Sequence, residues 1–168
     1  FYCNAVRGIG LRGGKLFSSI AVEVDCATEK EEIAGFILAQ LFSVDEMEDK
    51  DIFPSHKEPK EVMYILTLGL RQKHRRRGLA SLLVERCQFA AEMDPQCGLL
   101  YLHVIHNNAA ALNFYTVNNF AKIRDLPDFY RIGNEYHNAY LYAKFLNNFK
   151  SITSADDESI AGLVSALA

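Results

Sequence analysis

The fold of this chain is decided by residues 62–81, V-M-Y-I-L-T-L-G-L-R-Q-K-H-R-R-R-G-L-A-S. Apolar and β-branched residues fill positions 62–71, which predicts a strand. From 78 to 92 the apolar residues instead recur at helical spacing, which predicts a helix. Gly78 stands where this helix opens, and it lets an anion approach the free N–H groups of the first turn. The stretch therefore predicts a strand, a loop and an anion-binding helix N-terminus.

Positive charge is concentrated in that loop. Residues 71–77 read R-Q-K-H-R-R-R, five Lys and Arg in seven residues, whereas the whole chain has a formal net charge of −3. One basic spot on an acidic body suits a local pyrophosphate and does not suit a nucleic-acid duplex. The glycines match neither the Walker phosphate loop nor the dinucleotide-binding motif. The alternative interpretation of the basic run is a solvent-exposed face or a localisation signal.

Strands are expected on both sides of this unit. Residues 16–24 and 33–42 predict a hairpin. Residues 43–60 are acidic and hold two prolines, so we expect an exposed loop there. Further along, a strand is predicted at 99–105, a helix at 109–117, and two strands at 120–126 and 136–146 with an aromatic loop, 126–132, between them.

The length of the chain and the order of the predicted strands and helices indicate one mixed α/β domain over residues 1–150. Of the 168 residues 49% are hydrophobic and 23% charged, which argues against disorder. No apolar run reaches about 18 residues, so no spanning helix is expected. The four cysteines form no C-x-x-C pair, which favours a reducing, cytosolic compartment. Residues 151–168 predict an amphipathic helix that packs on the body, on a partner or on a membrane surface.

Two motifs resemble a known family. The R-x-x-G-x-A element at 75–80, after a strand ending L-T-L-G-L, resembles the acetyl-CoA loop of the GNAT acyltransferase superfamily. Residues 101–115, Y-L-H-V-I-H-N-N-A-A-A-L-N-F-Y, are similar to the next strand and helix of that fold. More narrowly, V-M-Y-I-L-T-L-G-L, Y-L-H-V and L-P-D-F-Y-R-I together resemble the NatF-type N-alpha-acetyltransferases, Golgi-associated enzymes that acetylate the N-terminal Met of transmembrane proteins. The resemblance covers residues 60–147 and, more loosely, 1–45.

The resemblance implies the GNAT fold, a mixed sheet whose central parallel strands splay apart. It implies acetyl-CoA as co-substrate, no metal, and protein or peptide N-termini as substrates of a monomer that binds no nucleic acid. It implies a location in the cytoplasm or on the cytoplasmic side of the Golgi membrane, with peripheral contact through residues 155–168. In the family a strand and two helices precede the hairpin, and the loop between the helices walls the peptide groove. Here we expect that material to be missing or reduced to residues 1–15.

The resemblance also implies roles for individual residues. Tyr64 and His103 match the family's catalytic pair, and Leu66 and Tyr130 match positions that contact the peptide. The sequence Asp128-Phe129-Tyr130 departs from an all-tyrosine run in the family. The residues that match the acetyl-CoA site are Leu68, Gly69, Leu70, Arg76, Arg77, Gly78, Leu79, Ala80, Ser81, Asn108, Tyr115, Thr116, Val117 and Asn118.

The pKa values of amines are consistent with Tyr64 and His103 as a catalytic pair. An α-amino group has a pKa near 8 and is roughly one-tenth neutral at pH 7, whereas a lysine amine is less than about 0.1% neutral. An N-terminal acetyltransferase can therefore use a modest base. His103, a polar residue in an apolar strand, suits that task, with Tyr64 orienting a water or sharing the proton. The backbone N–H near Leu68 is placed to hold the oxyanion, and Tyr115 to protonate the thiolate.

Three functions stay open at this stage. N-alpha-acetyl transfer is the leading hypothesis. Lysine acetylation, including that of histones, is favoured by the acidic residues 45–51. A non-catalytic acetyl-CoA-binding or membrane-adaptor domain is favoured by the reduced N-terminal segment.

Overall fold

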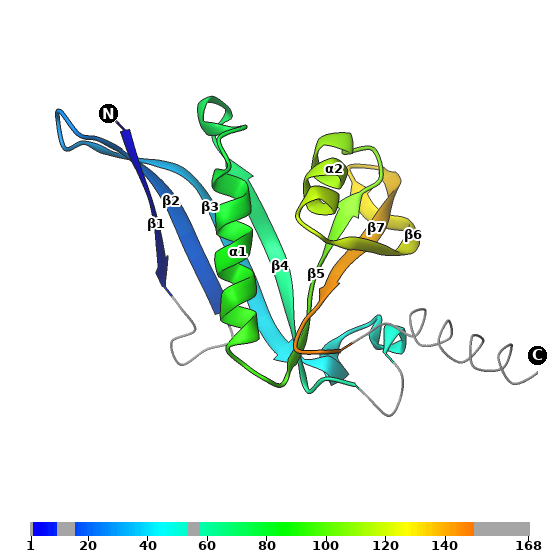
Figure 1. The fold of residues 1–168 in the computed structure, drawn as a ribbon. Coiled ribbons are helices and arrows are strands. Elements are labelled where there is room, and N and C mark those ends of the chain that lie inside the picture. The colour runs from blue at the N-terminus through cyan, green and yellow to red at the C-terminus, as the bar shows by residue number, and fades with distance from the viewer. Residues whose placement is uncertain (1, 10–15, 54–57, 150–168) are drawn as a thin grey trace, which may run out of the picture.

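The computed structural model describes residues 2–9, 16–53 and 58–149, and its centre is a seven-stranded mixed sheet of order β1-β2-β3-β4-β5-β7-β6 (Figure 1). Helix α1 follows β4 and helix α2 follows β5, as predicted. No helix in these ranges has the length and apolar character needed to cross a membrane. The elements are β1 (Tyr2–Ile9), β2 (Leu16–Asp25), β3 (Glu31–Ser43), β4 (Glu61–Leu70), α1 (Leu79–Glu92), β5 (Cys97–Ile105), α2 (Ala109–Val117), β6 (Ala121–Ile132) and β7 (Glu135–Phe145).

Strands β4 and β5 are the parallel neighbours of the sheet, and they pair only at their N-terminal ends. The last paired residues are Tyr64 and Tyr101, after which the two strands diverge (Figure 1). Beyond that point β4 continues to pair with β3, and β5 with β7. The expected splay of the central parallel strands is confirmed. It leaves an opening between the carboxyl ends of the two strands.

Helix α1 covers one face of the N-terminal half of the sheet (Figure 1). Leu79, Leu83 and Cys87 are buried at a spacing of four residues, and they pack against core side chains of β2 to β5. This spacing places them on one side of the helix. The helix is thereby fixed to the strands, and so is the loop that leads into it.

The segment 43–60 is not the exposed loop that its acidic composition predicts. It contains two single-turn 3-10 helices, η1 (Val44–Glu46) and η2 (Lys50–Ile52). Its apolar side chains Val44, Met47, Ile52 and Phe53 are buried in a second core cluster against β4, β5 and β7. The prediction fails because these apolar side chains turn into the core while the acids of the segment, Asp49 excepted, face outward.

One further expectation is corrected, and another is made specific. Residues 2–9, in the segment expected to be missing or reduced, form an edge strand, β1, which pairs antiparallel with β2. Residues 126–132 are not a hairpin loop, because β6 continues through them to Ile132 and the turn follows at Gly133. The predicted helix at 151–168 lies outside the described residues.

Truncation of Leu83 to alanine is expected to destabilise the fold. Its side chain is completely buried between α1 and the sheet, so the cavity should cost about 3 kcal/mol in the free energy of unfolding. Leu82, the next residue of the same helix, is 44% exposed, and Leu82→Ala should cost less than about 1 kcal/mol. Urea unfolding measures both values. Equal losses would contradict the packing of α1 described above.

Candidate active site

The opening between β4 and β5 holds a cleft of about 340 Å³. Strand β4 supplies one wall, β5 the other, and α2 and β6 close the sides. Six residues predicted for the catalytic, peptide and cofactor sites line it together. The lining residues are Ile65, Leu66, Thr67, Leu68, Leu102, His103, Val104, Ile105, Asn108, Ala111, Tyr115, Tyr130 and Ile132.

His103 lines this cleft, and it meets Tyr64, which is not one of the lining residues. The Tyr64 hydroxyl lies 3.2 Å from Nδ1 of His103, and it donates this hydrogen bond when Nδ1 carries no proton. Tyr64 pairs with Tyr101 in the parallel register, and His103 is the next residue of β5 on the same face. The two side chains thus meet where the strands begin to separate. Sequence reasoning predicted both residues, and the structure brings them together.

The second ring nitrogen of His103 faces an acid that sequence analysis missed. Nε2 is buried and has no hydrogen-bond partner among the described residues, and Oδ2 of Asp49 lies 3.8 Å away. Arg124 holds Asp49 in place through a 2.7 Å contact between Nη1 and Oδ1. Asp49 belongs to the segment taken for an exposed loop, and no motif marks it among the neighbouring acids. Only the packing of η1 and η2 brings it to the site.

Burial sets the protonation states of the pair. Burial lowers the pKa of His103 below its ordinary value of 6.5, and the negative charges of Asp49 and Glu48 partly oppose this. Burial raises the pKa of Tyr64 to about 12. At neutral pH the imidazole is therefore neutral and accepts a proton, whereas the phenol keeps its proton and donates a hydrogen bond. The same cause raises the pKa of Tyr115 to about 12.

The mouth of the cleft is formed by an irregularity in β6. The register with β7 shifts between Leu126 and Tyr130, and Asp128 has a positive φ of 51°. The N–H of Asp128 donates to Oδ1 of Asn138 at 2.9 Å, which fixes the bulge. Phe129 consequently packs on His103 with ring centroids 4.4 Å apart. The Tyr130 hydroxyl donates to the backbone carbonyl of His103 at 3.2 Å.

The open edge of β4 lies on the other side of the cleft. Leu68, Gly69 and Leu70 pair with β3 but have no strand partner on the side of β5. Apart from the Leu70 carbonyl, which accepts from Nε of Arg75 at 3.2 Å, the backbone groups on that side are open to an extended ligand.

Asn108 is the N-cap of α2, where its side chain accepts the N–H of Ala111 at 3.1 Å.

The loop before α1 has the backbone of an anion site. Arg76 and Gly78 both adopt positive φ, 60° and 78°, and Gly78 is the N-cap of α1. Such backbone turns the N–H groups of successive residues to one side. The Leu79 side chain is buried in the core, so any contact to a ligand comes from its backbone. Thr116, Val117 and Asn118, also predicted for the cofactor, are absent from the residues that line the cleft.

Comparison with known proteins agrees with this geometry. The sequence model of the acetyltransferase (GNAT) family matches residues 17–120. This chain belongs to that family. The matched GNAT region includes the strand, basic loop and helix quoted at the outset, and it includes both Tyr64 and His103.

Two named relatives are similar over most of the chain. N-alpha-acetyltransferase 60 of Xenopus tropicalis is 33% identical over 142 residues, which are 82% of this chain and 57% of that protein. Histone acetyltransferase MCC1 of Arabidopsis thaliana is 34% identical over 124 residues, 72% of this chain and 50% of that protein. This chain thus spans about half the length of the curated relatives that it matches.

A solved GNAT structure is similar in fold. Arabidopsis thaliana NAA60 in complex with acetyl-CoA gives a TM-score of 0.73 at 28% identity, covering 88% of this chain and 100% of that one. The same protein with a bisubstrate analogue gives a TM-score of 0.69 at 31% identity, covering 80% and 78%.

Replacement of Asp49 by asparagine is expected to lower the pKa of His103 further. The carboxylate favours the protonated imidazole, so its loss leaves burial unopposed except by Glu48. His103 should then titrate at a lower pH in an NMR titration of the histidine ring protons. Asp45→Asn is the matched control, because Asp45 lies in the same segment with its side chain 81% exposed. Equal shifts in both variants, or none in Asp49→Asn, would contradict the assigned contact.

Proposed function

We propose that this chain transfers the acetyl group of acetyl-CoA to the N-terminal amine of a protein or peptide. The observation that carries the proposal is the hydrogen bond between Tyr64 and His103, a residue that lines the cleft between β4 and β5. The N-alpha-acetyltransferase relative supports the acceptor, and the acetyl-CoA complex of NAA60 supports the donor.

The cofactor half of the proposal rests on two backbone features. The unpaired edge of β4 from Leu68 to Leu70 suits the amides of a pantetheine arm, because an extended ligand can add to it like a strand. The N-terminus of α1, opened by Gly78, suits the pyrophosphate. Arg76 supplies an exposed positive charge beside it.

Proton transfer follows from the protonation states. The amine nitrogen attacks the thioester carbon, a C–N bond forms, and the C–S bond breaks. A proton leaves the amine, directly or through a water, for the oxygen of Tyr64, while the Tyr64 proton moves to Nδ1 of His103. The imidazolium that results faces Asp49 through Nε2, and this carboxylate stabilises it. Tyr64 thus relays a proton without first becoming a phenolate.

The leaving sulfur lies at the other end of the cleft in this proposal. Tyr115 lines the cleft, and burial raises its pKa to about 12, so it is a weaker acid than a thiol with a pKa near 8.5. It therefore stabilises the sulfur by donating a hydrogen bond and keeps its proton. The backbone N–H groups near Leu68 hold the negative charge that develops on the acetyl oxygen.

Acceptor specificity separates this proposal from lysine acetylation. Leu66, Phe129 and Ile132 are exposed apolar side chains of the strands that frame the cleft, and they suit an apolar first residue such as Met. Lysine acetylation is the second candidate, because one relative is named a histone acetyltransferase and acids stand beside His103.

The Golgi location, peripheral membrane contact through 155–168 and the monomeric state rest on the resemblance alone. They remain part of the proposal. Sedimentation of the full chain with liposomes, compared with a chain ending at residue 150, tests the membrane contact.

Peptide acetylation distinguishes the two candidate acceptors. A Met-Lys peptide with a free N-terminus should be acetylated by the chain with labelled acetyl-CoA, and a twin with a blocked N-terminus should not. Mass spectrometry locates the acetyl group. Acetylation of the blocked peptide at its lysine would replace the proposal with lysine chemistry.

Tyr64→Phe, which removes the phenol hydroxyl, should lower kcat at least about tenfold, because the proton relay to His103 is lost. Acetyl-CoA affinity should stay the same, as measured by calorimetry. Tyr136→Phe is the matched control, since Tyr136 is 61% exposed on β7 and should behave like the wild type. An unchanged kcat in Tyr64→Phe would refute the role of this hydroxyl.

A further inference from the structure

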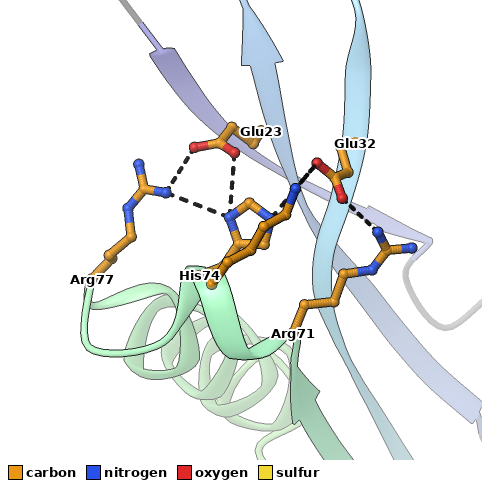
Figure 2. Close-up of polar contacts among 6 residues, drawn as sticks. Glu23, Glu32, Arg71, His74 and Arg77 are labelled. Carbon is orange, nitrogen blue, oxygen red and sulfur yellow. Dashed lines mark hydrogen bonds and ion pairs between the residues drawn. The ribbon is translucent and has the colours of Figure 1, made fainter.

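Two glutamates face each other on the sheet behind the basic loop. Glu23 of β2 and Glu32 of β3 are direct partners in the antiparallel register. Like charges placed directly opposite on one face of a sheet destabilise it. Both side chains point toward the loop that precedes α1 (Figure 2). This pair therefore needs positive charge from the loop.

His74 lies between the two carboxylates. It is the last residue of the 3-10 turn η3 (Gln72–His74), and it is 1% exposed. Its Nδ1 is 3.3 Å from Oε2 of Glu23, and its Nε2 is 4.0 Å from Oε2 of Glu32. Nε2 has no hydrogen-bond partner among the described residues. Packing alone does not account for a buried imidazole whose two nitrogens both face carboxylates.

Three cations of the loop complete the cluster. Arg77 donates to Oε1 of Glu23 at 2.7 Å, and Arg71 and Lys73 both bind Glu32 (Figure 2). The contacts to Glu23 matter more than those to Glu32, because the Glu23 side chain is 13% exposed and that of Glu32 is 37% exposed.

The basic run is thereby divided into two groups. Arg71, Lys73 and Arg77 are directed to the sheet, and Arg75 donates to the carbonyl of Leu70 at 3.2 Å. Among the described residues neither Arg75 nor Arg76 has a carboxylate partner. The cations that hold the loop are thus different from those left for an anion.

We propose that Glu23 and Glu32 form an acidic clamp on the sheet that binds His74 and the cations of the loop 71–77, and so holds this loop in its anion-binding shape. They are positioning residues for acetyl-CoA, and this inference rests on the proposed function. The clamp orders the backbone from Arg76 to Gly78 before the ligand arrives, so that binding does not have to order it.

A metal site is the rival explanation of the same cluster. One ligand atom each from Glu23, Glu32 and His74 lie within 4.8 Å of one another. Both carboxylates, however, already bind cations of the loop, and a metal ion would have to displace them. The charge balance therefore favours the clamp.

The direction in which Glu23→Gln changes the Kd for acetyl-CoA tests the clamp. Glu23 is a negative charge near the proposed pyrophosphate site, so simple electrostatics predicts that Glu23→Gln binds acetyl-CoA more tightly. The clamp predicts the opposite, an increase in Kd of about tenfold in calorimetry. Glu85→Gln removes a charge from an exposed position of α1 and should leave Kd within about twofold. An unchanged or lower Kd in Glu23→Gln would overturn the clamp.

Hydrogen exchange without ligand makes the test independent of acetyl-CoA. The backbone amides of residues 71–78 should exchange faster in Glu23→Gln and in His74→Gln than in the wild type, with the rest of α1 unchanged. If the wild-type chain bound no acetyl-CoA, the proposed function would fail, and unchanged exchange in both variants would overturn the clamp separately. Stabilisation of the wild type by Zn²⁺, absent in His74→Gln, would replace the clamp with a metal site.

Discussion

The separation of β4 and β5 after Tyr64 and Tyr101 is the constraint on which the site depends. Two parallel strands that stay paired leave no room for a ligand between them. Here each strand keeps a different outer neighbour, β3 for β4 and β7 for β5, so divergence costs hydrogen bonds only along the inner edges. Those unpaired inner edges, with the cleft between them, are what the chain offers to a substrate.

Burial and charge act together at the base of that cleft. Desolvation keeps His103 neutral and Tyr64 protonated, which gives the pair one acceptor and one donor at neutral pH. Asp49 partly opposes the lowering of the His103 pKa by burial, and it faces the ring nitrogen that has no hydrogen-bond partner in the described part of the chain. Arg124 in turn neutralises Asp49. A proton received at the imidazole is therefore stabilised by a carboxylate that the cation keeps in place.

Sequence reasoning could predict elements of the site only where the chain itself carries a local signal. A strand ending in a basic loop and a glycine requires a helix N-terminus at Gly78, whatever the rest of the fold. The helical period of α1 and the apolar run of β5 predict the core face by spacing, whereas His103 is assigned from the family resemblance. Asp49 could not be found in this way, because its segment carries several acids and only the burial of Met47 and Ile52 turns one of them toward the imidazole.

The sequence by itself determined the mixed α/β class and most of the strands and helices from β2 to β7. These follow from periodicity, which acts over a few neighbouring positions. The anion-binding loop and the pair of Tyr64 and His103 are predictions that rest on motifs and on the family resemblance. The tertiary structure decided the bulge that brings Phe129 over His103 and the partners of the basic loop. It placed Glu23 opposite Glu32, a contact set by strand register. Register and packing join residues far apart in the chain, so no local pattern encodes them.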